Sequence, residues 1–526
     1  MVKSKRLETV LQWMDGHFCL MLLFLSILHL FTRLWLLADI PVGYHGDELA
    51  IAYDSLSIAR DHVDRYLYKM PIYFKNYGDG MNVGYIYLTA PLFKLFGYSK
   101  LALRLPAAIV GLVLLIFGSL TAKEFFRSSK AGLTVGALLT ICPIFISMQR
   151  FALESPLLLN FWVMSLYFLL RGVHTGKARH YLFSGLLFGY TFYHYALGYV
   201  MIPLFFLLYG AYLLYVKKLS LCKYASTVAI AGILAIPLIM EILVNSGHLP
   251  ELRFTYLSFP KLDAYRGVEF SLSHIPKNLY LIKNLFTYDW LEYTGVPEFG
   301  CMYYMSIPLI LFGQACLISE AVSSIRKRIY NPLCCALAME LSIIMIVFIL
   351  DNPTDSRAYC LYYPFTVCIA AAIRFIYRKA RTWALLPVFA YAAVFASFMY
   401  FYFNIYPVKY AVQVNFEPME IYKSLETFIA KDHLTDWDTA VYIDTEKETS
   451  NVELQVLLCL QASAFEWHRV QKYGYVRNIH FLTYSSDLDR GNSSFIVENT
   501  DEAFKRKLTE AGYEAVDSTE WYTLYK

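Results

Sequence analysis

The sequence has 526 residues, of which 57% are hydrophobic and only 17% are charged. With a mean hydropathy of +0.43, this composition excludes a soluble globular enzyme and is typical of a membrane protein with many spans. The net charge of +4 gives no reason to expect a nucleic-acid partner. Most cysteines fall inside apolar segments, so we expect neither a disulfide framework nor a cysteine metal site.

Eleven hydrophobic stretches are long enough to cross a bilayer. They predict an all-α polytopic membrane domain over residues 1–409. The first stretch has no small-residue cleavage site after it, so we expect a retained helix and not a signal peptide. The predicted spans are Phe18–Ala38, Leu101–Ala122, Ala131–Gln149, Pro156–Leu170, Tyr181–Gly198, Tyr199–Val216, Tyr224–Val244, Met302–Glu320, Leu333–Leu350, Ala358–Ile376 and Ala384–Phe403.

Alternate connections between these stretches are short and basic, as Lys123, Arg127 and Lys130 after the second span illustrate. Cytoplasmic loops are enriched in Lys and Arg. The pattern therefore predicts a multi-pass plasma-membrane protein with a cytoplasmic N-terminus. Residues 39–100 and 245–300 then form large outer loops. An apolar run such as Tyr85–Phe96 is too interrupted to span and is expected to lie in the membrane interface as an amphipathic helix.

Residues 410–526 alternate short apolar strands with polar helices, which predicts a small extracytoplasmic α/β domain. This segment contains no glycine-rich phosphate loop and no nucleophile motif. A structural or acceptor-gripping role is the expectation, and Asn492-Ser493-Ser494 fits a glycosylation sequon. The predicted strands are Ala440–Ile443, Asn478–Thr483 and Ser494–Val497, and the predicted helices are Met419–Ala430 and Thr500–Ala511.

The stretch Gly43-Tyr44-His45-Gly46-Asp47-Glu48 follows the first span directly. Adjacent carboxylates repel each other and are poorly solvated near hydrocarbon, so we expect at least one raised pKa. A carboxylate tuned in this way suits a general base. The alternative is that Asp47 and Glu48 occupy the first turn of a helix, where acidic residues are mildly stabilising.

Further polar residues lie where spans meet the outer face: Arg104, Arg150, Glu154, His194 and Arg357. Charged groups at membrane depth are expensive and usually functional. Arg150 and Glu154 could instead form an ion pair across their turn, and a lone histidine among tyrosines is more often structural. Arg357 could anchor its helix by snorkelling or bind a phosphate with its planar fork. Acids and arginines on one face suit a reaction in which a lipid-linked phosphate leaves.

The ordered motifs resemble the GT-C glycosyltransferases that use polyprenyl-phosphate sugars. The branch is the family 39 type, which contains protein O-mannosyltransferases and the lipid A aminoarabinose transferase. The resemblance covers Phe18 to Phe403 in layout and is dense in motif only over Tyr44–Leu159. The motifs are Asp47-Glu48, Tyr53-Asp54, Asp64-Arg65, Pro71-Ile72-Tyr73, Leu95-Phe96-Gly97, Arg104-Leu105-Pro106, Arg150 with Glu154-Ser155-Pro156, and Arg357.

This resemblance implies that Asp47 is the catalytic base, that Glu48 supports it, and that Glu154 is a second acid of the site. Many relatives carry Asp at the last position, so a role for Glu154 as a ligand of a divalent metal cofactor stays open. No β-trefoil insert is evident in residues 245–300, which favours a bacterial enzyme. Arg357, Arg150 and Arg104 are expected to bind the donor phosphate, and His45, Tyr53, His194 and Tyr195 to contact substrate.

The sequence therefore predicts an inverting membrane glycosyltransferase with an outward-facing site. Its donor would be a polyprenyl-phosphate monosaccharide, and its acceptor a protein, a glycolipid or an envelope polymer. The alternatives are a transporter or flippase of lipid-linked sugars and an inactive scaffold of the same fold. A transporter predicts inverted repeats and ionisable residues at mid-span. Few ionisable residues, such as the acids Glu241 and Glu340, fall inside the predicted spans, and the other charges cluster at one face, which favours the enzyme.

Overall fold

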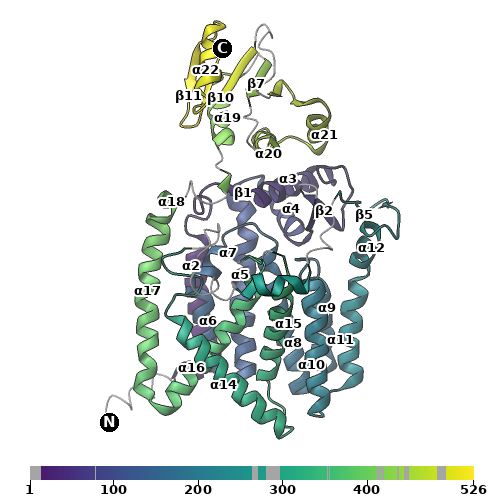
Figure 1. Ribbon diagram of the computed structural model, residues 1–526, viewed down its shortest axis with the longest axis vertical. Helices are drawn as coiled ribbons and strands as arrows, with labels where there is room; N and C mark the ends of the chain where they lie inside the picture. The colour runs from purple at the N-terminus through teal and green to yellow at the C-terminus, as the bar shows by residue number, and fades with distance from the viewer. Residues whose placement is uncertain are drawn as a thin grey trace.

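The computed structural model describes residues 13–76, 79–263, 270–279, 296–351, 353–354, 356–410, 416–417, 420–434, 438–442, 449–482 and 493–526. A bundle of long helices forms one end of the molecule and a small α/β domain forms the other (Figure 1). The short helices that follow the first span lie between these two parts. This arrangement confirms the all-α polytopic fold with a C-terminal α/β domain.

Six helical segments in the described residues have the length and apolar composition to cross a membrane. Three further apolar helices are shorter, α2 (Phe18–Leu34), α6 (Ser129–Ile141) and α15 (Leu333–Ile349). A seventh span is possible by length if the bent pair α11 (Leu221–Leu234) and α12 (Ile236–Asn245) is counted as one. The six are α5 (Lys100–Phe126), α8 (Ser155–Thr175), α10 (Gly198–Tyr215), α14 (Ser306–Arg326), Tyr359–Lys379, which contains α16 (Tyr362–Lys379), and α17 (Leu385–Asn404).

Three of the eleven predicted spans are interrupted where the sequence suggested continuous helices. The stretch Ala131–Gln149 divides between α6 and α7 (Pro143–Met148), and α11 meets α12 at an angle of 48°. Both breaks precede a proline in the first turn of the next helix, which has no N–H to continue the preceding hydrogen-bond ladder. Within Tyr181–Gly198, helix α9 (Ala178–Thr191) ends early and turns follow.

The first large connection folds into α3 (Gly46–Asp61), a hairpin of β2 (Tyr73–Asn76) and β3 (Asp79–Asn82), and α4 (Gly84–Phe96). Helix α4 matches the predicted interfacial run Tyr85–Phe96. Helix α3 is buried continuously from Glu48 to Ile58. It is therefore covered on all sides, by α4 and by the C-terminal domain.

The C-terminal domain is built on a six-stranded sheet with the order β11-β12-β10-β7-β9-β8. Strand β7 (Asp438–Tyr442) runs parallel to β9 (Ile479–Leu482) and β10 (Ser493–Glu498), which together confirm the three predicted strands. Antiparallel pairs complete the sheet. The other elements are β8 (Tyr475–Val476), β11 (Ala515–Ser518), β12 (Tyr522–Tyr525), α19 (Glu420–Ala430), α20 (Thr449–Cys459), α21 (Ala464–Tyr473) and α22 (Glu502–Glu510).

The C-terminal domain is docked on α3 by backbone and side-chain hydrogen bonds. The Tyr53 hydroxyl donates to the Ser463 carbonyl at 2.8 Å, and the Asp61 carboxylate accepts from the Ala464 N–H at 2.9 Å. Strand β1 (Tyr44–His45) also pairs with β6 (Phe416–Glu417), just before the domain. The domain is thus fixed to the same helix that begins at the Asp47-Glu48 pair.

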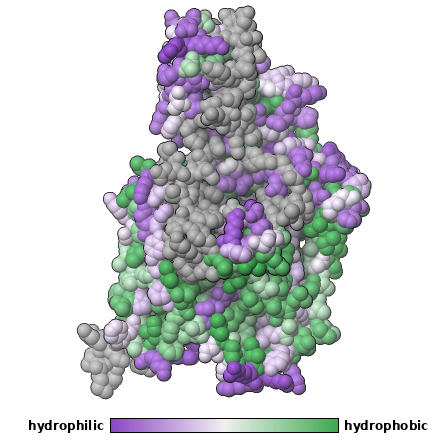
Figure 2. Space-filling model, viewed as in Figure 1, coloured by the Kyte–Doolittle hydropathy of each residue, from purple (hydrophilic) through white to green (hydrophobic). Residues whose placement is uncertain are grey.

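On the face shown in Figure 2, hydrophobic residues cover the helical bundle and hydrophilic residues lie at both ends of the molecule. The surface of α17 contributes exposed Leu386, Val388, Phe389 and Tyr400. Such a contiguous apolar surface requires a lipid environment.

Of the second large loop, residues 245–263, 270–279 and 296–300 are described, including β4 (Leu252–Arg253) and β5 (Ser258–Phe259). Residues 264–269 and 280–295 of this loop, and the sequon residue Asn492, lie outside the described residues.

Candidate active site

The Asp47-Glu48 pair occupies the first turn of α3, as the helix-start alternative predicted. His45 is the N-cap, and its Nδ1 accepts a hydrogen bond from the Asp47 N–H at 3.1 Å. Glu48 Oε2 accepts from the His45 N–H at 3.1 Å, which completes a capping box. A capping role does not exclude a chemical one, because capping engages the Glu48 carboxylate and leaves the Asp47 carboxylate to other partners.

The Glu48 carboxylate is fully buried against Arg104, which is also fully buried. Arg104 Nε and Nη2 donate to its two oxygens at 2.9 and 2.8 Å, and the Ala152 N–H donates at 2.7 Å. Burial by itself would raise the pKa of Glu48, but the Arg104 charge and these hydrogen bonds bring it below its ordinary value. The expectation of a raised pKa is therefore wrong for Glu48, which is ionised and fixed in place.

Asp47 differs from its neighbour because 40% of its side chain is exposed. Its Oδ1 accepts a hydrogen bond from Asn76 Nδ2 at 2.9 Å, and its Oδ2 lies 3.6 Å from His45 Nδ1. Asn76 in turn accepts from Arg65 Nη2 at 2.9 Å. Arg65 is anchored by buried Asp54, its Nε lying 3.6 Å from Asp54 Oδ2. This chain orients a carboxylate that remains accessible to a substrate.

The β2–β3 hairpin also holds the third predicted acid, Glu154. The Asn82 N–H donates to Glu154 Oε2 at 2.5 Å. Asn82 Nδ2 donates to the Phe192 carbonyl at 3.2 Å and to the Tyr199 hydroxyl at 2.7 Å. One end of the hairpin thus contacts Asp47 and the other end contacts Glu154, so the same two-stranded element links the two carboxylates.

The structure gives Arg104 and Arg150 structural tasks that the sequence did not predict. Besides Glu48, Arg104 donates to the carbonyls of Leu37, Pro41 and Gly43. Arg150 is fully buried, and all three of its guanidinium nitrogens donate to carbonyls at the end of α2 and just beyond it, those of Thr32, Arg33, Trp35, Leu36 and Ile40. Helix ends leave such carbonyls unsatisfied. The alternative of an Arg150–Glu154 ion pair is therefore not realised.

Arg357 lies in a different setting from these two arginines. It precedes the short helix η3 (Tyr359–Leu361) and is half-buried. Its Nη1 donates to the Asp351 carbonyl at 2.9 Å, and its backbone N–H faces Thr354 Oγ1 at 3.4 Å. The guanidinium is thus held next to the start of the apolar segment Tyr359–Lys379.

The aromatic and histidine candidates separate into distinct environments. His194 is fully buried and stacks on Phe161 with ring centroids 4.4 Å apart. Burial lowers its pKa to about 3, and neither ring nitrogen has a hydrogen-bond partner within the described residues. This is the structural role that the sequence left open. Tyr195 is also buried, and the Tyr53 hydroxyl donates to the Ser463 carbonyl of the C-terminal domain. The expected contacts of these two residues with substrate stay predictions.

Sequence reasoning missed Asn76 and Asn82, which orient the two acids. Their signal was present in the run Tyr73–Asn82, because two short segments that flank a glycine-containing link are typical of a β-hairpin. For the described part of the chain, no group of three or more His, Cys, Asp or Glu side chains is arranged to hold a metal ion.

The multi-span helical bundle with its short helices at one end is an integral membrane fold of the GT-C type, as the following structural similarity shows. The fold is similar to that of ArnT from Cupriavidus metallidurans bound to undecaprenyl phosphate, with a TM-score of 0.58, 13% identity, and coverage of 97% of this chain and 98% of that chain. The apo state of the same protein gives 0.57 and 12% identity over the same shares. Residues 83–241 match the family described as dolichyl-phosphate-mannose-protein mannosyltransferase. Comparison with curated protein sequences gives no match.

Proposed function

We propose that this protein is an inverting glycosyltransferase that moves a monosaccharide from a polyprenyl-phosphate carrier to an acceptor. The acceptor class is a protein, a glycolipid or an envelope polymer. The observation that carries the proposal is the contrast within the adjacent pair. Glu48 is buried and neutralised by Arg104, whereas Asp47 is exposed and oriented by Asn76. The similarity to ArnT bound to undecaprenyl phosphate supports a polyprenyl-phosphate donor.

In the proposed reaction Asp47 accepts the proton of the attacking hydroxyl or amine while the new bond to the anomeric carbon forms. The bond between that carbon and the carrier phosphate oxygen breaks, and the phosphate leaves with the electron pair. A single displacement of this kind inverts the anomeric centre. General-base assistance typically contributes a factor of roughly 10²–10⁴ in rate.

Arg357 is the arginine that we assign to the leaving phosphate. Its position at the end of a span matches the depth of a lipid headgroup, and its planar fork suits a phosphate. Arg104 and Arg150 support the site from behind, because all their guanidinium nitrogens donate to protein acceptors. Glu154 is assigned as a second acid that faces the same hairpin as Asp47.

We also propose that the site and the C-terminal domain face away from the cytoplasm. The basic connections lie at the helix ends opposite α3, as Lys123 near the end of α5 illustrates, and such connections are retained in the cytoplasm. An outward site would meet carrier-linked sugars and envelope acceptors on the same side of the membrane.

The test of the proposed activity is incubation of the purified protein with a panel of radiolabelled polyprenyl-phosphate sugars and envelope extracts. We expect one donor to transfer its label to an acceptor with release of the carrier phosphate. Movement of the intact labelled donor across proteoliposomes without transfer would instead favour the flippase. Absence of both, with donor bound, would favour the inactive scaffold.

A further inference from the structure

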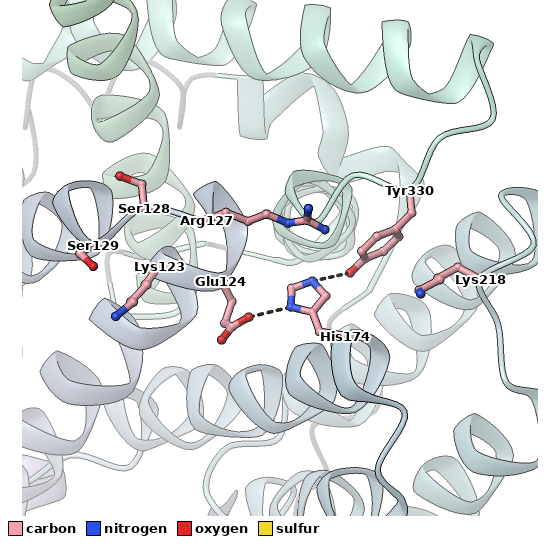
Figure 3. Close-up of a pocket in the computed structure, with 8 residues that line it drawn as sticks. All are labelled: Lys123, Glu124, Arg127, Ser128, Ser129, His174, Lys218 and Tyr330. Carbon is pink, nitrogen blue, oxygen red and sulfur yellow. Dashed lines mark hydrogen bonds and ion pairs between the residues drawn. The ribbon is translucent and has the colours of Figure 1, made fainter. Parts of the chain in front are cut away.

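A second polar site lies at the opposite ends of the helices from Asp47. It is a cavity of about 460 Å³, within the usual size of small-ligand sites. The ends of α5 and α8, the start of α6 and the connections before α11 and α15 surround it (Figure 3). Its lining residues are Lys123, Glu124, Arg127, Ser128, Ser129, His174, Lys218 and Tyr330.

The one acid in this lining is already neutralised by its neighbours. Glu124 Oε2 lies 2.6 Å from His174 Nδ1, and its Oε1 accepts from Arg171 Nη1 at 3.1 Å. His174 Nε2 lies 3.3 Å from the Tyr330 hydroxyl. This chain fixes the floor of the cavity and prevents the Glu124 charge from opposing an anion bound above it.

Two basic side chains extend toward this floor from different segments. Figure 3 shows the Arg127 side chain reaching across the cavity toward Tyr330, with Lys218 on the other side of the tyrosine ring. Across the described residues, neither cation forms an ion pair, although many other basic side chains of the chain do. The cavity is thus lined by hydroxyl groups and by two cations that have no carboxylate partner among the described residues.

We propose that this cavity binds a phosphate group. An arginine fork and an ammonium that line the same cavity can bind phosphate with charge-assisted hydrogen bonds. The cavity lies at the ends of apolar helices, where headgroups of a leaflet are found. The phosphate belongs to an anionic phospholipid headgroup or to a soluble phosphate ester. This site is separate from the Asp47 site, and the proposal does not depend on the transferase activity.

Native mass spectrometry of the purified full-length protein tests the lipid source. Phosphatidylglycerol and phosphatidylcholine are compared as ligands, because both carry a phosphate and only the first has a net charge. We expect preferential retention of phosphatidylglycerol and a loss of at least about tenfold in its apparent affinity in Arg127→Gln/Lys218→Gln. The matched control is Lys177→Gln/Arg179→Gln, which removes one exposed lysine and one exposed arginine from the same face outside the cavity.

Isothermal titration of inorganic phosphate into protein in phosphatidylcholine nanodiscs tests the soluble source. Binding that is lost in Arg127→Gln/Lys218→Gln and kept in the control identifies a soluble phosphate as the ligand. Thermal unfolding verifies that each variant is folded. If the double variant does not fold, the single variant Lys218→Glu replaces it, because Lys218 is at an exposed position. Equal retention of both lipids together with no phosphate binding, or equal losses in the variant and the control, would overturn the proposal.

Discussion

Replacing Glu48 with glutamine should destabilise the protein far more than replacing its neighbour Asp47 with asparagine. The Glu48 carboxylate is fully buried and accepts hydrogen bonds from Arg104, Ala152 and His45. The substitution leaves the Arg104 guanidinium buried without its counter-charge. Breaking a buried ion pair by removing one partner costs about 3–5 kcal/mol.

The matched substitution Asp47→Asn keeps a carbonyl oxygen for Asn76 at a side chain that is 40% exposed. Its cost should be at most about 1 kcal/mol, because exposed polar groups exchange protein partners for water. Both variants change one carboxylate to its amide in the first turn of α3, so the two lose a comparable interaction of negative charge with the helix N-terminus. The expected difference between them is about 2 kcal/mol or more.

The assay is thermal unfolding of each purified variant in the same detergent, followed by tryptophan fluorescence and by size-exclusion profile. The folded pKa of Glu48 lies below its ordinary value, so the carboxylate contributes stability above the unfolded pKa of about 4.3. That contribution is lost as the pH falls through the folded pKa, and Glu48→Gln should lack this part of the pH dependence. Equal stability of the two variants at neutral pH would refute the structural role of Glu48.

Three further predictions follow from the same geometry. Asn76→Leu should lower kcat and leave KM for the donor nearly unchanged, because Asp47 loses its orienting hydrogen bond. An unchanged kcat would contradict the orienting role of Asn76. Arg357→Lys should weaken donor binding and keep the fold, since the charge remains and the fork is lost; unchanged affinity in a lipid-donor titration would move the phosphate elsewhere. The third prediction uses a background that lacks the exposed cysteines Cys19 and Cys222. In intact cells, Ala503→Cys should react with an impermeant thiol reagent and Thr175→Cys should not. The reverse labelling would overturn the proposed orientation.

The class of fold could be predicted from the sequence because long apolar stretches leave few alternatives in a bilayer. Strands β7, β9 and β10 and helix α4 were likewise predicted from short-range periodicity. The structural tasks of Arg104 and Arg150 could not be predicted, because most of their acceptors are backbone carbonyls, such as those of Pro41 and Thr32. Every residue carries a carbonyl, so no sequence pattern identifies which of them lack a partner after folding.

The roles within the candidate site divide in the same way. Local sequence placed Asp47 and Glu48 at a helix start but could not distinguish the exposed carboxylate from the buried one. That distinction depends on α5 bringing Arg104 beneath Glu48, a contact between residues 56 positions apart. Likewise, the docking of Tyr53 on the C-terminal domain required knowledge of where a distant segment returns.

The most direct test of the central claim is a single-turnover measurement of sugar transfer by Asp47→Asn with its cognate polyprenyl-phosphate sugar. The variant keeps the size of the side chain and the hydrogen bond from Asn76 but cannot accept a proton at neutral pH. We expect a folded protein that binds donor as the wild type does and transfers sugar more slowly by a factor of roughly 10²–10⁴. Transfer at a rate near that of the wild type would show that Asp47 only begins α3, and would contradict its assignment as the base.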